Sequence, residues 1–155
     1  VVDGVAEVNW SGRDQIEEIG GRTWIFDVAH NSAGVGSLVD VLDRIDFPRP
    51  WVALIGVLGD RDWRSMLPPV LQRVDRAILT RPSSVPPERC WDTTEAAEAV
   101  GALLPAGYPL TTEPDFSDAF DCARAGPPGG TVIVTGSCHT VGDALKRLNR
   151  CPFRG

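Results

Sequence analysis

The sequence predicts an α/β domain of three layers, in which a mostly parallel sheet of about six strands lies between helices on both faces. Two observations lead to this fold class. Short runs rich in β-branched and aromatic residues alternate along the chain with stretches whose apolar residues recur at helical spacing. Consecutive strand–helix units of this kind build a parallel sheet, because each helix carries the chain back across a face of the sheet.

The expected strands differ in how deeply they should be buried. Trp51 to Val57 is apolar throughout, which is typical of a strand covered on both faces. Tyr108 to Thr112 contains Pro109, whose missing N–H suits the edge of a sheet. An additional strand or hairpin is expected near Val5 to Ile19, and one edge strand is a candidate for antiparallel pairing. The remaining strands are expected at Thr23 to Val28, Arg76 to Thr80 and Thr131 to Thr135.

The expected helices alternate with these strands. From Asn31 to Ile45 the apolar residues fall on one helical face. Trp63 to Val74 has similar spacing, but Pro68 and Pro69 lie inside it and would kink or split a helix. The other helices are expected at Thr93 to Leu104, at Asp115 to Ala125 with Asp115 as N-cap, and at Val141 to Leu148.

Charge and composition exclude several classes of protein. A net charge of −6 opposes a general affinity for nucleic acid or for an anionic membrane. No apolar run approaches the roughly 18 residues of a membrane span. The four cysteines form no C-x-x-C pair and only two histidines are present, so neither a zinc site nor a disulfide framework is implied. We therefore expect a cytoplasmic protein with reduced thiols.

The length of 155 residues fits one domain spanning residues 1–155. The sequence begins at Val1, and its only methionine is Met66. Because translation normally starts at methionine, we expect this sequence to be a segment of a longer protein or a processed form of one.

Ligands of parallel α/β folds bind beyond the carboxyl ends of the strands, so the residues after each strand are candidates for a site. Asp27-Val28-Ala29-His30-Asn31 follows the first long strand. Asn31 would cap the next helix, whose amino end favours anions, and Asp27 has acceptors for a sugar hydroxyl. A helix cap with an ordinary polar turn explains these residues equally well.

A charged loop, Gly56-Val57-Leu58-Gly59-Asp60-Arg61-Asp62, follows the next strand. Arg61 offers a planar guanidinium that suits a carboxylate, including that of an amino acid. On spacing alone, a solvated loop in which Asp62 caps the next helix is the simpler interpretation.

A glycine-serine turn, Thr135-Gly136-Ser137-Cys138-His139-Thr140, follows the last strand. It would present amide donors and a hydroxyl to an anion, or simply cap the helix that follows. A nucleophile and base formed by His139 with Ser137 or Cys138 is disfavoured, because adjacent side chains rarely face each other and no third residue is seen to orient the histidine.

Two phosphate-binding motifs are missing from the sequence. No G-x-G-x-x-G follows the first strand, and no G-x-x-x-x-G-K-[ST] occurs. The chain therefore has no P-loop of its own for the β- and γ-phosphates of ATP.

Four segments together resemble the carboxyl-terminal domain of the folylpolyglutamate synthase/dihydrofolate synthase family, which belongs to the Mur ligase superfamily. They are Trp10 to Arg13, Ile25 to Asn31, Gly56 to Asp62 and Val134 to Ser137. Their order and spacing match along nearly the whole chain, and the Asp-x-Ala-His-Asn segment is the most specific. The resemblance implies a Rossmann-like domain from an ATP-dependent ligase.

The resemblance implies a reaction that joins glutamate to the carboxylate of a folate or a dihydropteroate. ATP phosphorylates this carboxylate, and the amine of L-glutamate attacks the acyl phosphate. A P-loop ATPase domain, amino-terminal in the same polypeptide, would hold the magnesium ions and most of the pterin site. ATP and Mg²⁺ are thus the implied cofactors, and L-glutamate and a folate-type acid are the implied partners.

The resemblance also implies a nucleotide site. Carried over by motif, Arg13 would contact the ATP phosphates and Asp27 would bind the ribose, with Asn31 at the same site. His30 would lie at the junction of nucleotide and glutamate as a positioning group. No residue is assigned to the chemical step or to a metal.

The implied glutamate site contains His30, Arg61 and Ser137. Arg61 would bind a glutamate carboxylate, and Ser137 would donate a hydrogen bond to glutamate from the start of a helix. The sequence departs from the family at three places. Arg61 stands where the family usually has Lys, and Val28 where it commonly has Gly. Cys138-His139-Thr140 replaces a more apolar, aromatic stretch.

Three alternatives stay open. One is a free-standing α/β module that binds an amino acid or nucleotide without catalysis. A phospho-receiver with Asp27 or Asp60 as acceptor is disfavoured, because its paired acids are not evident. A peptidoglycan ligase of the Mur type shares the architecture but usually differs in the Asp-x-Ala-His-Asn signature.

Overall fold

The computed structural model describes residues 14–125 and 128–150. Six strands form one sheet in the order β1-β2-β6-β3-β4-β5. The pair β1–β2 is antiparallel, and the other neighbouring pairs are parallel. The bounds are β1 Gln15–Ile19, β2 Arg22–Phe26, β3 Trp51–Ile55, β4 Arg76–Leu79, β5 Leu110–Thr112 and β6 Thr131–Thr135. The predicted α/β class and the antiparallel edge strand are confirmed.

Two of the strand predictions concern the edges of the sheet. The strand expected near Val5 to Ile19 is β1, although the part of that range before residue 14 lies outside the described residues. The strand with Pro109 is β5, which forms the opposite edge. The single-domain prediction for residues 1–155 also includes residues outside the described ranges, and it stays a prediction.

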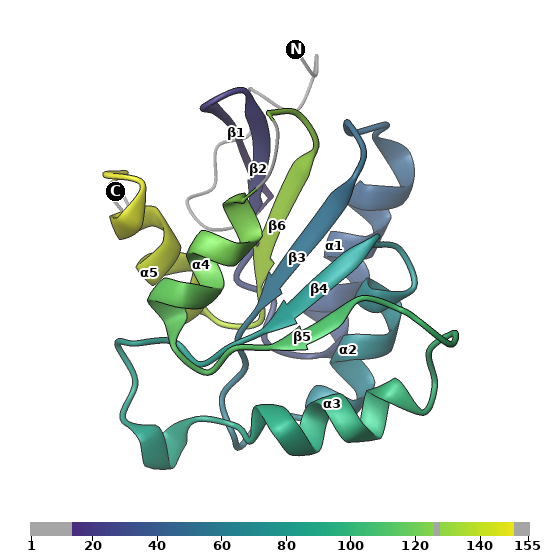
Figure 1. Ribbon diagram of the computed structural model, residues 1–155, viewed down its shortest axis with the longest axis vertical. Coiled ribbons are helices and arrows are strands. Elements are labelled where there is room, and N and C mark those ends of the chain that lie inside the picture. Colours follow the sequence, from purple (N-terminus) through teal and green to yellow (C-terminus); the bar gives the residue numbers. More distant parts are fainter. Residues whose placement is uncertain (1–13, 126–127, 151–155) are drawn as a thin grey trace.

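Helices cover both faces of the sheet (Figure 1). On one face lie α1, α2 and α3, whereas α4 and α5 lie on the other. Their bounds are α1 Ser32–Arg44, α2 Trp63–Leu71, α3 Thr93–Gly101, α4 Phe116–Arg124 and α5 Cys138–Arg147, with a 3₁₀ helix, η1, at Pro87–Arg89. None of the described helices combines the length and apolar character needed to cross a lipid bilayer.

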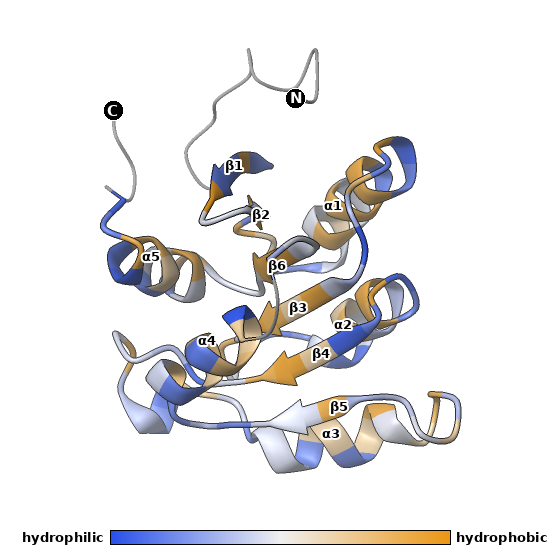
Figure 2. Cartoon of the chain, turned by 45° about the horizontal axis from the view of Figure 1, so that its top comes forward, coloured by the Kyte–Doolittle hydropathy of each residue, from blue (hydrophilic) through white to orange (hydrophobic). Residues whose placement is uncertain are grey.

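The core lies in two layers, because successive side chains of a strand point to opposite faces. In β3, Ala53 and Ile55 pack with α1, α2 and α3, whereas Val52 and Leu54 pack with α4 and α5. Both central strands, β3 and β6, are buried along their whole length, and for β3 this confirms the prediction from its continuous apolar run. Figure 2 shows the apolar colour concentrated in these central strands.

The helix that contains the two prolines is continuous. Pro68 and Pro69 lack the N–H groups that would bond one turn back, yet α2 passes through both. Its buried side chains, which include Met66, Leu67 and Val70, hold it against the core. The helix ends at Leu71 rather than at the expected residue 74.

The boundaries of two other helices also differ from the prediction. The last helix, α5, begins at Cys138 instead of Val141, because Ser137 caps it three residues earlier than the apolar spacing indicates. The third helix, α3, ends at Gly101 instead of Leu104. Glycine is a poor helix former, and the chain continues in tight turns there.

Candidate functional site

The three strand ends that carry the sequence motifs lie side by side. Strands β2, β6 and β3 are neighbours in the sheet, so Asp27, Gly136 and Gly56 leave it at the same edge. Backbone hydrogen bonds hold these exits together: the Asp27 N–H donates to Val134 O at 3.0 Å, and the Gly56 N–H donates to Thr135 O at 3.1 Å. The edge is the carboxyl end of the parallel strands, where α/β folds bind ligands.

Asp27 is held rigidly at this edge. Its side chain is buried, with Oδ1 accepting from the Ala29 N–H at 2.8 Å and Oδ2 from the Asp14 N–H at 3.0 Å. Each carboxylate oxygen still has a lone pair for a further donor. Asp27 lines a cavity of about 230 Å³ together with Asp14, His30 and Asn31.

The same cavity reaches the start of α1. Asn31 is the N-cap of this helix, and its Oδ1 accepts from the Gly34 N–H at 2.8 Å. The His30 Nδ1 lies 3.1 Å from Val28 O. A carbonyl oxygen only accepts, so Nδ1 carries the hydrogen and the Nε2 of the neutral ring is an acceptor. The capping interpretation of Asn31 is therefore confirmed, and His30 keeps one ring nitrogen for a ligand.

Ser137 is buried at the start of α5 and is already hydrogen-bonded. Its Oγ accepts from the Thr140 N–H at 3.1 Å and lies 2.9 Å from Thr140 Oγ1. Thr140 Oγ1 in turn donates to Gly56 O at 2.8 Å. Because the Thr140 proton points to Gly56, the Ser137 hydroxyl must donate to Thr140. This chain of bonds ties the start of α5 to the loop that follows β3.

The turn before Ser137 requires glycine. Gly136 has a φ of +111°, and a Cβ at this position would lie 2.5 Å from Gly56 O. A side chain here would therefore separate the exits of β6 and β3. Glycine allows the two loops to contact each other through their backbones.

Arg61 is exposed on the loop after β3. Its Nε lies 4.0 Å from Asp60 Oδ1, at the limit of an ion pair, and 42% of its side chain is accessible to solvent. Such a contact restrains the guanidinium weakly. Arg61 is therefore able to turn toward an incoming carboxylate.

A serine pair joins the loop of Arg61 to the turn of His30. Ser32 Oγ and Ser65 Oγ lie 2.7 Å apart, and Ser65 Oγ is also 2.8 Å from Asp62 Oδ2. Asp62 occupies the N-cap position of α2, but its carboxylate bonds Ser65 instead of a backbone N–H of the helix. The expected cap by Asp62 is thus replaced by a link between the first turns of α1 and α2.

The sequence did not single out the residues that make these connections. The predicted site residues Asp27, His30 and Asn31 lie together at one cavity, whereas Arg13 lies outside the described residues. The sequence did not predict a role for Ser32, Ser65 or Thr140, although Thr140 belongs to the segment that differs from the family pattern. Their one sequence signal is a hydroxyl in the first turn of a helix that follows a motif.

His139 takes no part in a nucleophile pair with its neighbours. Its Nδ1 lies 3.5 Å from Ser84 Oγ, in the loop after β4, while the Ser137 hydroxyl is bonded to Thr140. Cys138 is exposed at the first position of α5. The geometry therefore agrees with the expectation that these adjacent residues do not form a catalytic pair.

The fold and the arrangement of these motifs define a member of a ligase superfamily. The family model described as "Mur ligase, glutamate ligase domain" matches residues 12–138. The chain belongs to this family, and the predicted resemblance is confirmed.

Similar proteins share this domain but are longer. The dihydrofolate synthetase of Saccharomyces cerevisiae is 24% identical in an alignment 156 residues long. The alignment covers 94% of this chain and 36% of that protein. The Mycobacterium tuberculosis folylpolyglutamate synthase complexed with ADP and AMPPCP superposes with a TM-score of 0.78 at 29% identity, covering 96% of this chain and 34% of that one. A bifunctional folylpolyglutamate synthase/dihydrofolate synthase with Mn, AMPPNP and L-glutamate bound superposes with a TM-score of 0.74 at 26% sequence identity. The match covers 91% of this chain and 32% of that one. The chain therefore spans about a third of the length of these relatives.

Proposed function

We propose that this chain is the carboxyl-terminal domain of an ATP-dependent ligase that adds glutamate to the carboxylate of a folate or dihydropteroate through an acyl phosphate. The observation that supports this most strongly is the meeting of the three family motifs at one edge of the sheet. A P-loop ATPase domain of the same polypeptide would bind the β- and γ-phosphates and Mg²⁺. This domain would contribute binding and positioning of glutamate and of part of ATP.

The nucleotide subsite of the proposal is the cavity at Asp27. The bonds from Ala29 and Asp14 fix the Asp27 carboxylate, and its remaining lone pairs suit the hydroxyls of a ribose. Asn31 keeps the start of α1 in place, and Arg13 would supply a cation for the phosphates. A fixed acceptor loses little entropy when it binds a ligand, which favours selective binding at this point.

The glutamate subsite lies between the loops after β3 and β6. Arg61 would bind a glutamate carboxylate with its planar guanidinium, which suits two-point contact. The His30 Nε2 is an acceptor in the neutral ring and would orient the ammonium or amine of glutamate. Ser137 would donate to glutamate only by exchanging its bond with Thr140, so we expect this serine to change partner on binding.

The chemical role of this domain is to hold the amine close to the acyl phosphate. The amine nitrogen forms the new amide bond with the acyl carbon, inorganic phosphate leaves, and the amine gives up a proton. Correct placement of two reactants accounts for a large part of the rate enhancement in reactions of this type. No described residue of the chain is required as a general base in this account.

The test uses the full-length protein that contains this chain. Replacing Arg13 or His30 by Ala should lower the ATP- and glutamate-dependent turnover by at least about tenfold, because both groups would position reactants. The matched control is His139→Ala, which removes the other histidine of the chain; His139 Nδ1 lies near Ser84 Oγ, and His139 does not line the cavity at Asp27. Wild-type turnover in Arg13→Ala or in His30→Ala would refute the corresponding role.

The isolated chain provides a second test. Because it lacks the P-loop motif, it should form no glutamyl product from ATP, glutamate and a folate-type acid. Product formation by the purified chain alone would refute the division of the site between two domains.

A further inference from the structure

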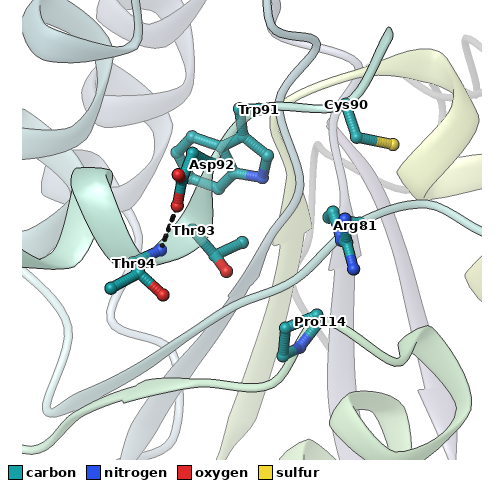
Figure 3. Close-up of a pocket in the computed structure, with 7 residues that line it drawn as sticks. All are labelled: Arg81, Cys90, Trp91, Asp92, Thr93, Thr94 and Pro114. Atoms are coloured by element: carbon teal, nitrogen blue, oxygen red, sulfur yellow. Dashed lines mark hydrogen bonds between the residues drawn. The ribbon is translucent and has the colours of Figure 1, made fainter. Parts of the chain in front are cut away.

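A second cavity lies at the far end of the carboxyl edge, beyond β4 and β5. It has a volume of about 320 Å³ and borders Arg81, Cys90, Trp91, Asp92, Thr93 and Pro114. Figure 3 shows Arg81 and Cys90 on one side and the first residues of α3 on the other, with Pro114 between them. The volume lies within the range of small-molecule sites. None of these residues belongs to the proposed ligase site.

The wall of this cavity contains a cation without a counter-ion. Arg81 is half-buried, yet its guanidinium makes no hydrogen bond or ion pair with any residue in ranges 14–125 and 128–150. Burial raises the pKa of the neighbouring Cys90 thiol, although the charge of Arg81 opposes this shift, so the thiol does not serve as the missing anion. A partly desolvated guanidinium is stabilised when a carboxylate fills its donors.

A carboxylate lies across the cavity from Arg81. Asp92 caps α3, with Oδ1 accepting from the Thr94 N–H at 2.9 Å and from the Glu95 N–H at 3.0 Å. Its other oxygen, Oδ2, has no hydrogen bond within the described part of the chain. The cavity therefore has the guanidinium of Arg81 on one side and the carboxylate of Asp92 on the other.

We propose that this cavity binds a free amino acid, with its carboxylate on Arg81 and its ammonium group on Asp92. Opposite charges on the two walls match the two charges of a zwitterion. A phosphate or a polyanion fits less well, because Glu113 and Asp115 line the adjoining cavity of about 560 Å³ that shares Arg81. Trp91 and Pro114 supply apolar surface for the side chain of the amino acid.

An occupant of this cavity would contact the segment that holds the loop of Arg61. Cys90 forms an antiparallel bridge with Leu58, and the Gly59 N–H donates to Arg89 O at 2.9 Å. A bound amino acid would therefore stabilise the pairing that fixes this loop. This coupling depends on the proposed function, whereas binding at the cavity does not.

The test is an NMR titration of the isotopically labelled chain with L-alanine, L-glutamate, sodium acetate and inorganic phosphate in turn. Both amino acids should shift the Arg81 Nε–H and the amides of Thr93 and Thr94, and acetate should shift them less. Arg81→Met should weaken binding by roughly tenfold or more, since a charge-assisted bond is lost. Arg89→Met is the matched control, because Arg89 is exposed on the same segment and borders neither cavity.

Three results would overturn the proposal. They are no shift at these residues with millimolar amino acid, equal shifts with phosphate and with alanine, and unchanged affinity in Arg81→Met. The Arg61→Met chain separates this site from the proposed glutamate subsite. Shifts at Thr93 and Thr94 should persist in that variant, whereas glutamate-dependent shifts near His30 should disappear.

Discussion

The hydroxyl of Thr140 offers a direct test of how the glutamate subsite is built. Thr140→Val replaces the hydroxyl by a methyl group of similar size, so it removes hydrogen bonds without opening a cavity. The variant loses the bond to Gly56 O at 2.8 Å and the acceptor for Ser137 Oγ at 2.9 Å. Thr140 and Ser137 are both buried, so water does not replace these partners.

The expected destabilisation by Thr140→Val is about 1–3 kcal/mol, because two buried polar groups lose a partner. It is measured as the difference in free energy of unfolding in urea, followed by tryptophan fluorescence. Thr112→Val, the same change at an exposed position of edge strand β5, is the matched control and should stay within about 0.5 kcal/mol of wild type.

A value for Thr140→Val as small as that of the control would refute the hydrogen-bond chain. In the full-length protein, Thr140→Val should also raise the KM for glutamate more than the KM for ATP. The reason is that the bonds of Thr140 join the loops after β3 and β6, whereas the cavity at Asp27 lies after β2.

Three further predictions follow from single residues. Gly136→Ala should destabilise the chain by more than about 2 kcal/mol in urea unfolding, because Gly136 has a positive φ and lies close to Gly56 O. A stability near that of the wild type would show that this turn adapts to a side chain. Asn31→Ala should cost about 0.5–2 kcal/mol by the same measurement, as expected for a lost helix cap, and Asn31→Asp should recover most of it. Burial raises the pKa of Tyr108 to about 12, so the folded chain holds this proton more tightly than the unfolded chain and loses stability as the pH rises from about 10 to 12. In Tyr108→Phe, the urea midpoint should fall less steeply between pH 9 and pH 12 than in the wild type. An unchanged pH dependence of the midpoint would assign the loss of stability to other groups.

The periodicity of apolar residues predicted most of the fold, because burial in the core determines that periodicity. The apolar residues expected on one face of α1, which include Val35, Leu38 and Leu42, are buried there. Strand β3 was evident as an uninterrupted apolar run, since both of its faces are covered. The bounds of edge strands and of helix ends differed more from the prediction, because single caps and turns determine them instead of a repeated pattern.

The candidate site could be predicted only in part, because its connections depend on how distant segments meet. The motifs indicated that Asp27, His30 and Arg61 follow strand ends, and the strand order places those ends near one another. The bonds from Thr140 to Gly56 and from Ser32 to Ser65 join residues 84 and 33 positions apart. Local sequence carries no signal for such pairs, since they depend on strand register and helix packing.

The proposed function depends above all on the binding of the glutamate substrate through Arg61. The most direct measurement is the KM for L-glutamate of the full-length protein carrying Arg61→Met, compared with Arg64→Met. Arg64 is an exposed arginine of the first turn of α2 that pairs with Glu95. We expect the KM for L-glutamate to rise roughly 10- to 100-fold in Arg61→Met, with the KM for ATP unchanged, and to change little in Arg64→Met. A wild-type KM for glutamate in Arg61→Met would contradict it.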